Sequence, residues 1–84
     1  MNDKKKEAFA FIFKAKKAAA KLKWLMFCAE PTVENLEYDA KRYEVYDNAV
    51  TFYRALYQWL DDGIISPENA YNAAFERSQE MLKP

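Results

Sequence analysis

Histidine is absent from this 84-residue sequence, and cysteine and glycine each occur only once. Without histidine, and with one thiol, the chain lacks the usual ligand sets for zinc and haem and has no base for a cysteine dyad. A single cysteine cannot form a disulfide within the chain, which fits a reducing compartment. One glycine leaves no glycine-rich phosphate loop. We therefore expect a protein that is not an enzyme, holds no metal or cofactor, and is cytoplasmic.

Long hydrophobic runs and an excess of one charge are also lacking. The run that begins at Ala8 ends at Lys14, too short for a signal sequence or a transmembrane segment. Basic and acidic residues number 13 each, whereas a small nucleic-acid-binding protein usually has a basic excess. The charges are nevertheless divided: residues 1–30 carry eight lysines and three acids, and residues 31–62 carry seven acids and three basic residues. We expect these two parts to attract each other, within the fold or between two copies.

Apolar residues make up 51% of the chain and aromatic residues 17%, enough for a folded core and for an aromatic interface. The first predicted helix, about residues 4–30, has a seam of apolar residues spaced three and four apart, the heptad pattern of packed helices. The seam consists of Ala8, Phe11, Ala15, Ala18, Leu22, Leu25 and Ala29, widened on one side by Ile12, Ala19 and Met26. We expect this seam to face the core.

The same helix carries a second apolar stripe, about 150° away from the seam. Its members are Phe9, Phe13, Ala20, Trp24 and Phe27. A helix that is apolar on two sides is normally enclosed by neighbours, from its own chain or from another. We expect the part from Phe9 to Phe13 to be core, and the end near Trp24 to meet another chain.

Two further helices are predicted, over about residues 33–61 and 67–82. Pro31 stops the first helix and Thr32 caps the second, and this short connection implies an antiparallel hairpin in which residues whose numbers sum to about 63 lie opposite each other. Gly63 ends the second helix, and Ser66 with Pro67 starts the third. The apolar seam of the second helix is Leu36, Ala40, Tyr43, Tyr46, Val50, Tyr53, Tyr57 and Leu60, and that of the third is Tyr71, Ala74, Phe75, Ser78 and Leu82.

These elements predict a single all-α domain over residues 1–84. It consists of a long antiparallel helical hairpin and a shorter third helix, a three-helix bundle completed by dimerisation. The third helix starts beside Phe9 and Leu60 and is long enough to cover about half of the first.

The uncovered half keeps a surplus of apolar side chains. Either the helices bend far enough to bury them, or they form a protein interface anchored by Trp24 and Phe27, which we favour. The predicted interface residues are Ala20, Trp24, Phe27, Leu36, Tyr38 and Tyr43. Cys28, among apolar neighbours, is expected to be a buried, inert thiol.

A basic stripe at helical spacing is formed by Lys14, Lys17 and Lys21. Its ordinary interpretation is a solvated face, and its functional one is an anion-binding surface for nucleic acid or an acidic membrane. The tyrosines of the second helix are expected in the core rather than stacked on bases.

The composition and pattern therefore predict a small helical protein–protein interaction module, an adaptor, structural subunit or inhibitor that binds a larger protein and forms a homodimer. Small helical proteins rich in aromatic residues are typical of phages and mobile elements. One alternative is a nucleic-acid-associated dimer that uses the lysine stripe. Another is an anti-CRISPR-like inhibitor of a host nuclease.

Overall fold

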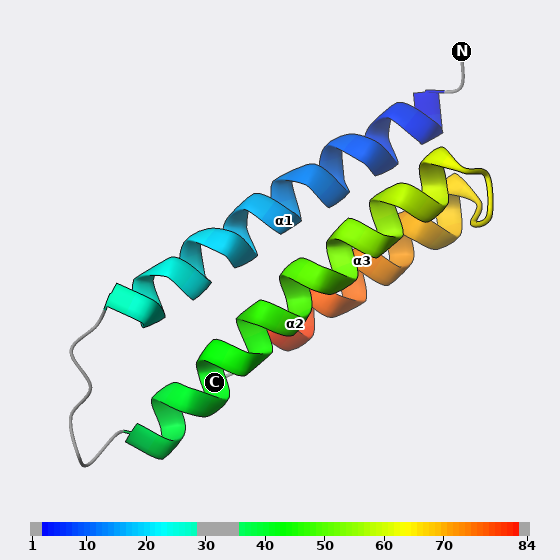
Figure 1. Cartoon of the computed structure of the whole chain (residues 1–84). Coiled ribbons are helices and arrows are strands. Elements are labelled where there is room, and N and C mark those ends of the chain that lie inside the picture. The colour runs from blue at the N-terminus through cyan, green and yellow to red at the C-terminus, as the bar shows by residue number, and fades with distance from the viewer. Residues whose placement is uncertain (1–2, 29–35, 83–84) are drawn as a thin grey trace.

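The computed structural model describes residues 3–28 and 36–82, with side chains in the second range described from residue 40 onward. It contains three α-helices, α1 (Asp3–Cys28), α2 (Leu36–Asp61) and α3 (Pro67–Leu82), with α1 and α2 forming an antiparallel hairpin and α3 lying along it (Figure 1). The predicted all-α hairpin with a shorter third helix is confirmed. The expected turn at Pro31 and Thr32, and the seam position Ala29, lie outside the described residues.

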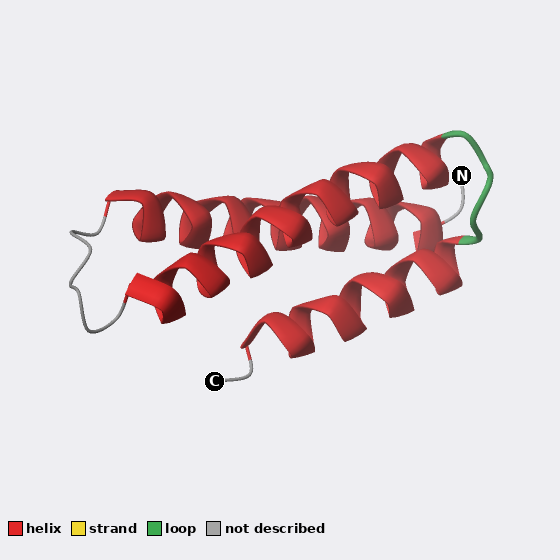
Figure 2. Cartoon of the chain, turned by 60° about the horizontal axis from the view of Figure 1, so that its bottom comes forward, coloured by secondary structure: helices red, strands yellow, loops and turns green. Residues whose placement is uncertain are grey.

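The turn between α2 and α3 follows from two local signals. Gly63 has a φ of 75°, and the hydrogen bonds Gly63 N–H to Leu60 O (3.2 Å) and Ile64 N–H to Trp59 O (2.9 Å) form a Schellman motif that ends α2. The Ser66 hydroxyl then accepts a hydrogen bond from the Asn69 N–H at 3.2 Å and caps α3. Both predicted signals are confirmed, and the turn returns α3 along the hairpin (Figure 2).

The core lies where the three helices meet. The buried residues of α1 are Ala8, Ile12, Ala15 and Ala19, with Leu22 and Met26 packed partly against them. The predicted seam was wrong at Ala18 and Leu25, which are exposed. Because α1 has to face α2 and α3 at the same time, its buried line runs through Ile12 and Ala19, the residues that the pattern had placed at the edge.

The buried lines of α2 and α3 also differ from the prediction. The buried residues are Tyr46, Ala49, Tyr53, Leu56 and Leu60 in α2, and Ala70, Ala74 and Met81 in α3. Tyr46 and Tyr53 are buried as predicted, but three other rings of the predicted seams are displaced outward: Tyr57, Tyr71 and Phe75 are 40%, 38% and 48% exposed. Leu82 is exposed as well. Small residues allow three helices to approach closely, so alanines share the centre with the buried rings of Tyr46 and Tyr53, and the other rings pack at the flanks.

The aromatic residues of the first turns of α1 separate into two directions. Phe9 packs on Tyr57 of α2 with ring centroids 4.7 Å apart, and Phe11 packs on Tyr71 of α3 at 4.6 Å. Phe13 was expected in the core but is 53% exposed. Two residues correspond to about 200° around a helix, so Phe13 points away from α3 when Phe11 points toward it.

Polar side chains bind α3 to α2. The Tyr53 hydroxyl lies 2.9 Å from Ser78 Oγ, and the Arg42 guanidinium donates a hydrogen bond to the Met81 carbonyl at 3.3 Å. The Arg77 guanidinium lies over the Phe52 ring at 4.4 Å. Arg42 of α2 thereby contacts the last turn of α3.

The register of the hairpin differs from the one expected. Lys23 pairs with Asp47 and Phe27 packs beside Tyr43, so opposing numbers sum to 70 there rather than to about 63. Phe27 is next to the last residue of α1, whereas Tyr43 lies well inside α2, so the start of α2 extends past the end of α1. Helix α3 ends at Leu82 and does not extend as far as the end of α1 and the start of α2 (Figures 1 and 2).

Candidate protein-binding groove

A groove runs between α1 and α2 on the side facing away from α3. Its α1 side carries Phe13, Lys16, Ala20, Lys23 and Phe27, with Trp24 at the rim, and its α2 side carries Tyr43, Asp47, Val50, Arg54 and Tyr57. We call it the outer groove. Both sets follow spacings of four and three residues, the positions that a further helix would contact in a helical bundle.

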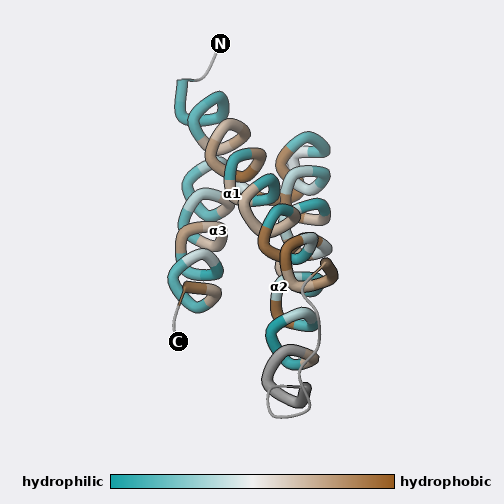
Figure 3. The backbone as a smooth tube through the Cα atoms, turned by 90° about the vertical axis from the view of Figure 1, so that its left-hand side faces the viewer, coloured by the Kyte–Doolittle hydropathy of each residue, from teal (hydrophilic) through white to brown (hydrophobic). Residues whose placement is uncertain are grey.

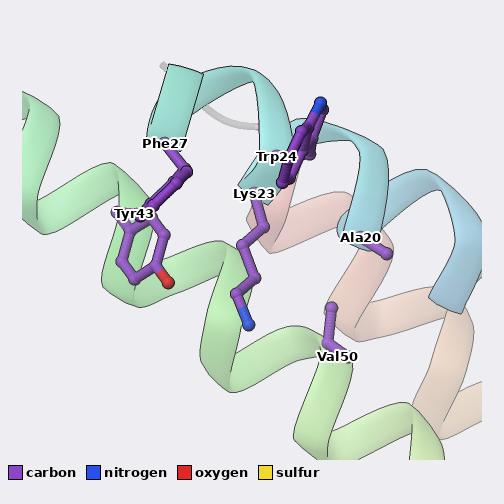
Figure 4. Close-up of a pocket in the computed structure, with 6 residues that line it drawn as sticks. All are labelled: Ala20, Lys23, Trp24, Phe27, Tyr43 and Val50. Atoms are coloured by element: carbon purple, nitrogen blue, oxygen red, sulfur yellow. The ribbon is translucent and has the colours of Figure 1, made fainter. Parts of the chain in front are cut away.

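The end of the outer groove near Trp24 is apolar. A hollow of about 380 Å³ is lined by Ala20, Lys23, Trp24, Phe27, Tyr43 and Val50 (Figure 4). The rings of Trp24 and Phe27 are stacked with centroids 6.0 Å apart, and Phe27 points toward Tyr43 across the groove, at 6.5 Å. Trp24 is 63% and Phe27 69% exposed. Hydropathy colouring shows the same apolar concentration at the end of α1 (Figure 3).

One ion pair joins α1 to α2 beside this hollow. Lys23 Nζ lies 2.8 Å from Asp47 Oδ1 and 5.8 Å from the centre of the Tyr43 ring. The hydrogen bond to Asp47 raises the pKa of Lys23, against a smaller opposing effect of desolvation. The pair joins the basic α1 to the acidic α2 and confirms, at one position, the expected attraction between the two parts of the chain.

The next section of the outer groove is basic. A second hollow of about 350 Å³ is lined by Phe13, Lys16, Arg54, Tyr57 and Gln58, without a carboxylate among them. Within the described residues, neither Lys16 nor Arg54 forms an ion pair. Two cations therefore line the groove between the aromatic residues Phe13 and Tyr57 and the small residues Ala20 and Val50.

Four of the six predicted interface residues come together in the apolar hollow: Ala20, Trp24, Phe27 and Tyr43. The side chains of Leu36 and Tyr38 lie outside the described part of the chain. Sequence reasoning missed Val50 and the whole basic section with Lys16 and Arg54. The sequence does contain a signal for Val50 and Arg54, because residues 43, 47, 50, 54 and 57 follow heptad spacing. Which residues of α1 lie opposite them depends on the register of the hairpin, which only the fold provides.

The lysine stripe and the thiol lie elsewhere. Lys14 lines a hollow between α1 and α3, whereas Lys17 Nζ lies 5.6 Å from the centre of the Phe13 ring, beside the outer groove. Lys21 is exposed. The three predicted anion-binding lysines thus do not line one hollow. Cys28 is exposed, not buried as expected, because it lies on the side of α1 opposite the core.

The described residues contain neither a membrane span nor a metal site. No helix there has the length and hydrophobicity of a membrane span, and no group of three potential metal ligands lies together. Comparison of the chain with protein-family models, with curated proteins and with solved structures finds no match.

Proposed function

We propose that the protein is a small helical interaction module that binds another protein chain in the outer groove. The observation that carries this proposal is the exposed pair Trp24 and Phe27 beside an apolar hollow. Large aromatic rings at a hollow are the side chains that contribute most to binding energy at protein interfaces. Their exposure in a single chain is costly, and a bound chain would bury them.

The total surface supports the proposal. The chain exposes 6341 Å², whereas a compact monomer of 9.9 kDa exposes about 5,200 Å². The difference, about 1,100 Å², reflects the elongated shape of the bundle, which leaves more surface open to a partner than a compact monomer has. Dimerisation and binding to a larger protein would both cover part of this surface, and adaptor, structural-subunit and inhibitor roles all use such a surface.

The proposal is tested with the double variant Trp24→Ala/Phe27→Ala. Wild-type protein is expected either to sediment as a dimer or to retain a defined protein from extracts of its source cells, and the variant is expected to lose that species. Both side chains are exposed, so the helical circular dichroism of the variant should match that of the wild type.

A matched control removes two similarly exposed apolar side chains elsewhere. Ile64 and Leu82 are 71% and 68% exposed and contribute nothing to the outer groove. Ile64→Ala/Leu82→Ala should bind like the wild type. If the two double variants lose the same partner to the same extent, non-specific hydrophobic association explains the binding. The proposal is contradicted if the wild type is a monomer and retains no protein whose binding depends on Trp24 and Phe27.

A further inference from the structure

The outer groove is layered, and its layers define what fits into it. From one end to the other, the opposing residues are Phe13 and Tyr57, Lys16 and Arg54, Ala20 and Val50, Lys23 and Asp47, and Phe27 and Tyr43. Aromatic rings close both ends and small side chains occupy the centre. A helix placed over the centre would come close to both α1 and α2, with its apolar side chains against the rings.

The charged layers are unequal. The Lys23 ammonium is neutralised by Asp47 at 2.8 Å, but Lys16 and Arg54 have no carboxylate in their hollow. The groove thus presents three cations and one carboxylate, a net charge of +2. An occupant that covers Lys16 and Arg54 with apolar atoms alone would desolvate two unpaired cations, which opposes binding.

Resting on the proposed function, we infer that the occupant of the outer groove is an amphipathic α-helix of another protein that carries acidic residues opposite Lys16 and Arg54. Its apolar side chains contact Trp24, Phe27 and Tyr43. The carboxylates form the charge-assisted hydrogen bonds that Arg54 and Lys16 lack within the described residues.

Charge distinguishes this occupant from a second copy of the chain. Two copies placed groove to groove would bring together six cations and only two carboxylates, because each copy contributes the same set. Like charges brought together across an interface oppose association. An acidic helix removes this repulsion, and the groove's basic section then adds to binding.

The geometry also sets the length of the helix. The groove extends from Phe13 to Phe27 along α1, which corresponds to about 21 Å at 1.5 Å per residue. A helix of about four turns therefore spans it, with apolar residues at heptad positions and acids beside them near one end.

The test uses a display library of amphipathic helices of about two heptads, with fixed apolar positions and with Glu, Gln or Lys allowed at the flanking positions. Helices are selected on the wild type and counter-selected on Trp24→Ala/Phe27→Ala. We expect Glu to be enriched at flanking positions near one end. Selection on Lys16→Glu/Arg54→Glu should enrich Lys at the same positions.

Affinities are then measured from Trp24 fluorescence in a Trp59→Phe background, since the chain has two tryptophans. Lys16→Gln/Arg54→Gln should weaken a selected Glu helix by about fivefold and leave its Gln counterpart unchanged. This milder variant also covers the case in which charge reversal prevents folding.

Each other outcome overturns the inference in a recognisable way. Equal selection of Gln or Lys helices would show that the groove binds helices without a preference for acids, and the proposed function would stand. A dimer that buries Trp24 would identify a second copy as the occupant and would also support the proposed function. If no helix depends on Trp24 and Phe27 and the chain is monomeric, both proposals are wrong.

Discussion

The hydroxyl of Tyr53 shows how one polar atom is accommodated in this core. Ser78 Oγ donates its proton to the Ala74 carbonyl at 2.9 Å, so at the 2.9 Å contact between the two hydroxyls Tyr53 must be the donor. The ring is fully buried, and its polar end reaches the edge of α3. The buried ring can therefore join α2 to α3 without leaving its donor unpaired.

Tyr53→Phe removes this hydrogen bond and keeps the ring. We expect the free energy of unfolding to fall by about 1 kcal/mol at neutral pH, measured by urea denaturation, because Ser78 keeps its bond to Ala74. Tyr57→Phe, on an exposed ring, is the control and should change the free energy by less than about 0.5 kcal/mol.

The same variant has a defined pH dependence. Burial raises the pKa of Tyr53, opposed in part by Ser78 and Arg77, so above about pH 10 the unfolded chain ionises this residue before the folded chain does. Wild-type stability from this group is complete below that pH and falls as the pH rises toward the raised pKa. The gap between wild type and Tyr53→Phe should therefore narrow at alkaline pH. A gap that stays constant from pH 7 to about pH 11 would contradict this role.

At the scale of elements, the turn between α2 and α3 depends on one backbone conformation. Gly63 has a φ of 75°, a region that side chains other than that of glycine disfavour. A Cβ added at Gly63 would meet no atom within 4 Å. Any cost of a side chain there is therefore conformational and not steric crowding by the neighbouring helices.

Gly63→Ala should lower the free energy of unfolding by about 1 kcal/mol, because alanine would have to adopt the left-handed conformation. Gly63→Asn should cost less, since asparagine tolerates this region better. Thermal and urea denaturation of the three proteins measure the order Gly, Asn, Ala. An alanine variant as stable as the wild type would show that the turn accepts another conformation.

Local signals in the sequence predicted where α2 ends and α3 begins. They did not predict which side of each helix faces the core. Gly63, Ser66 and Pro67 act within one turn of chain, so sequence suffices to place them. Which side of α1 is buried depends on two partners at once, and the strict heptad through Ala18 and Leu25 describes packing against one partner. The displacement to Ile12 and Ala19 results from α2 and α3 together, a property of tertiary packing that no single helix encodes.

At the scale of the molecule, the bundle is elongated. Its extents are 51 × 19 × 17 Å and its radius of gyration is 14.5 Å, against about 12 Å for a compact chain of this length. The apolar end of the outer groove could be predicted from the second apolar stripe of α1, which contains Ala20, Trp24 and Phe27. The expected reason, a third helix too short for the hairpin, was wrong, because the groove lies on the side that faces away from α3. The basic section could not be predicted, since Lys16 and Arg54 become neighbours only through the register that pairs Lys23 with Asp47.

The neighbouring residues Ile12 and Phe13 have different roles in α1: Ile12 contributes to folding and Phe13 to the proposed binding surface. Ile12 is fully buried where the three helices meet, whereas Phe13 is 53% exposed in the outer groove. Ile12→Ala should cost about 2–5 kcal/mol, a large share of the roughly 5–10 kcal/mol that stabilises a domain of this size, and should lower the unfolding midpoint of all three helices together.

Phe13→Ala should change the free energy of unfolding by less than about 1 kcal/mol but weaken binding of a helix that reaches this end of the groove. Circular dichroism during urea denaturation gives the stabilities, and Trp24 fluorescence gives the binding. The reverse result, with Phe13→Ala unfolding the protein and Ile12→Ala tolerated, would mean that the side of α1 with Phe9 and Phe13 faces the core. In that case the outer groove would not be an accessible surface.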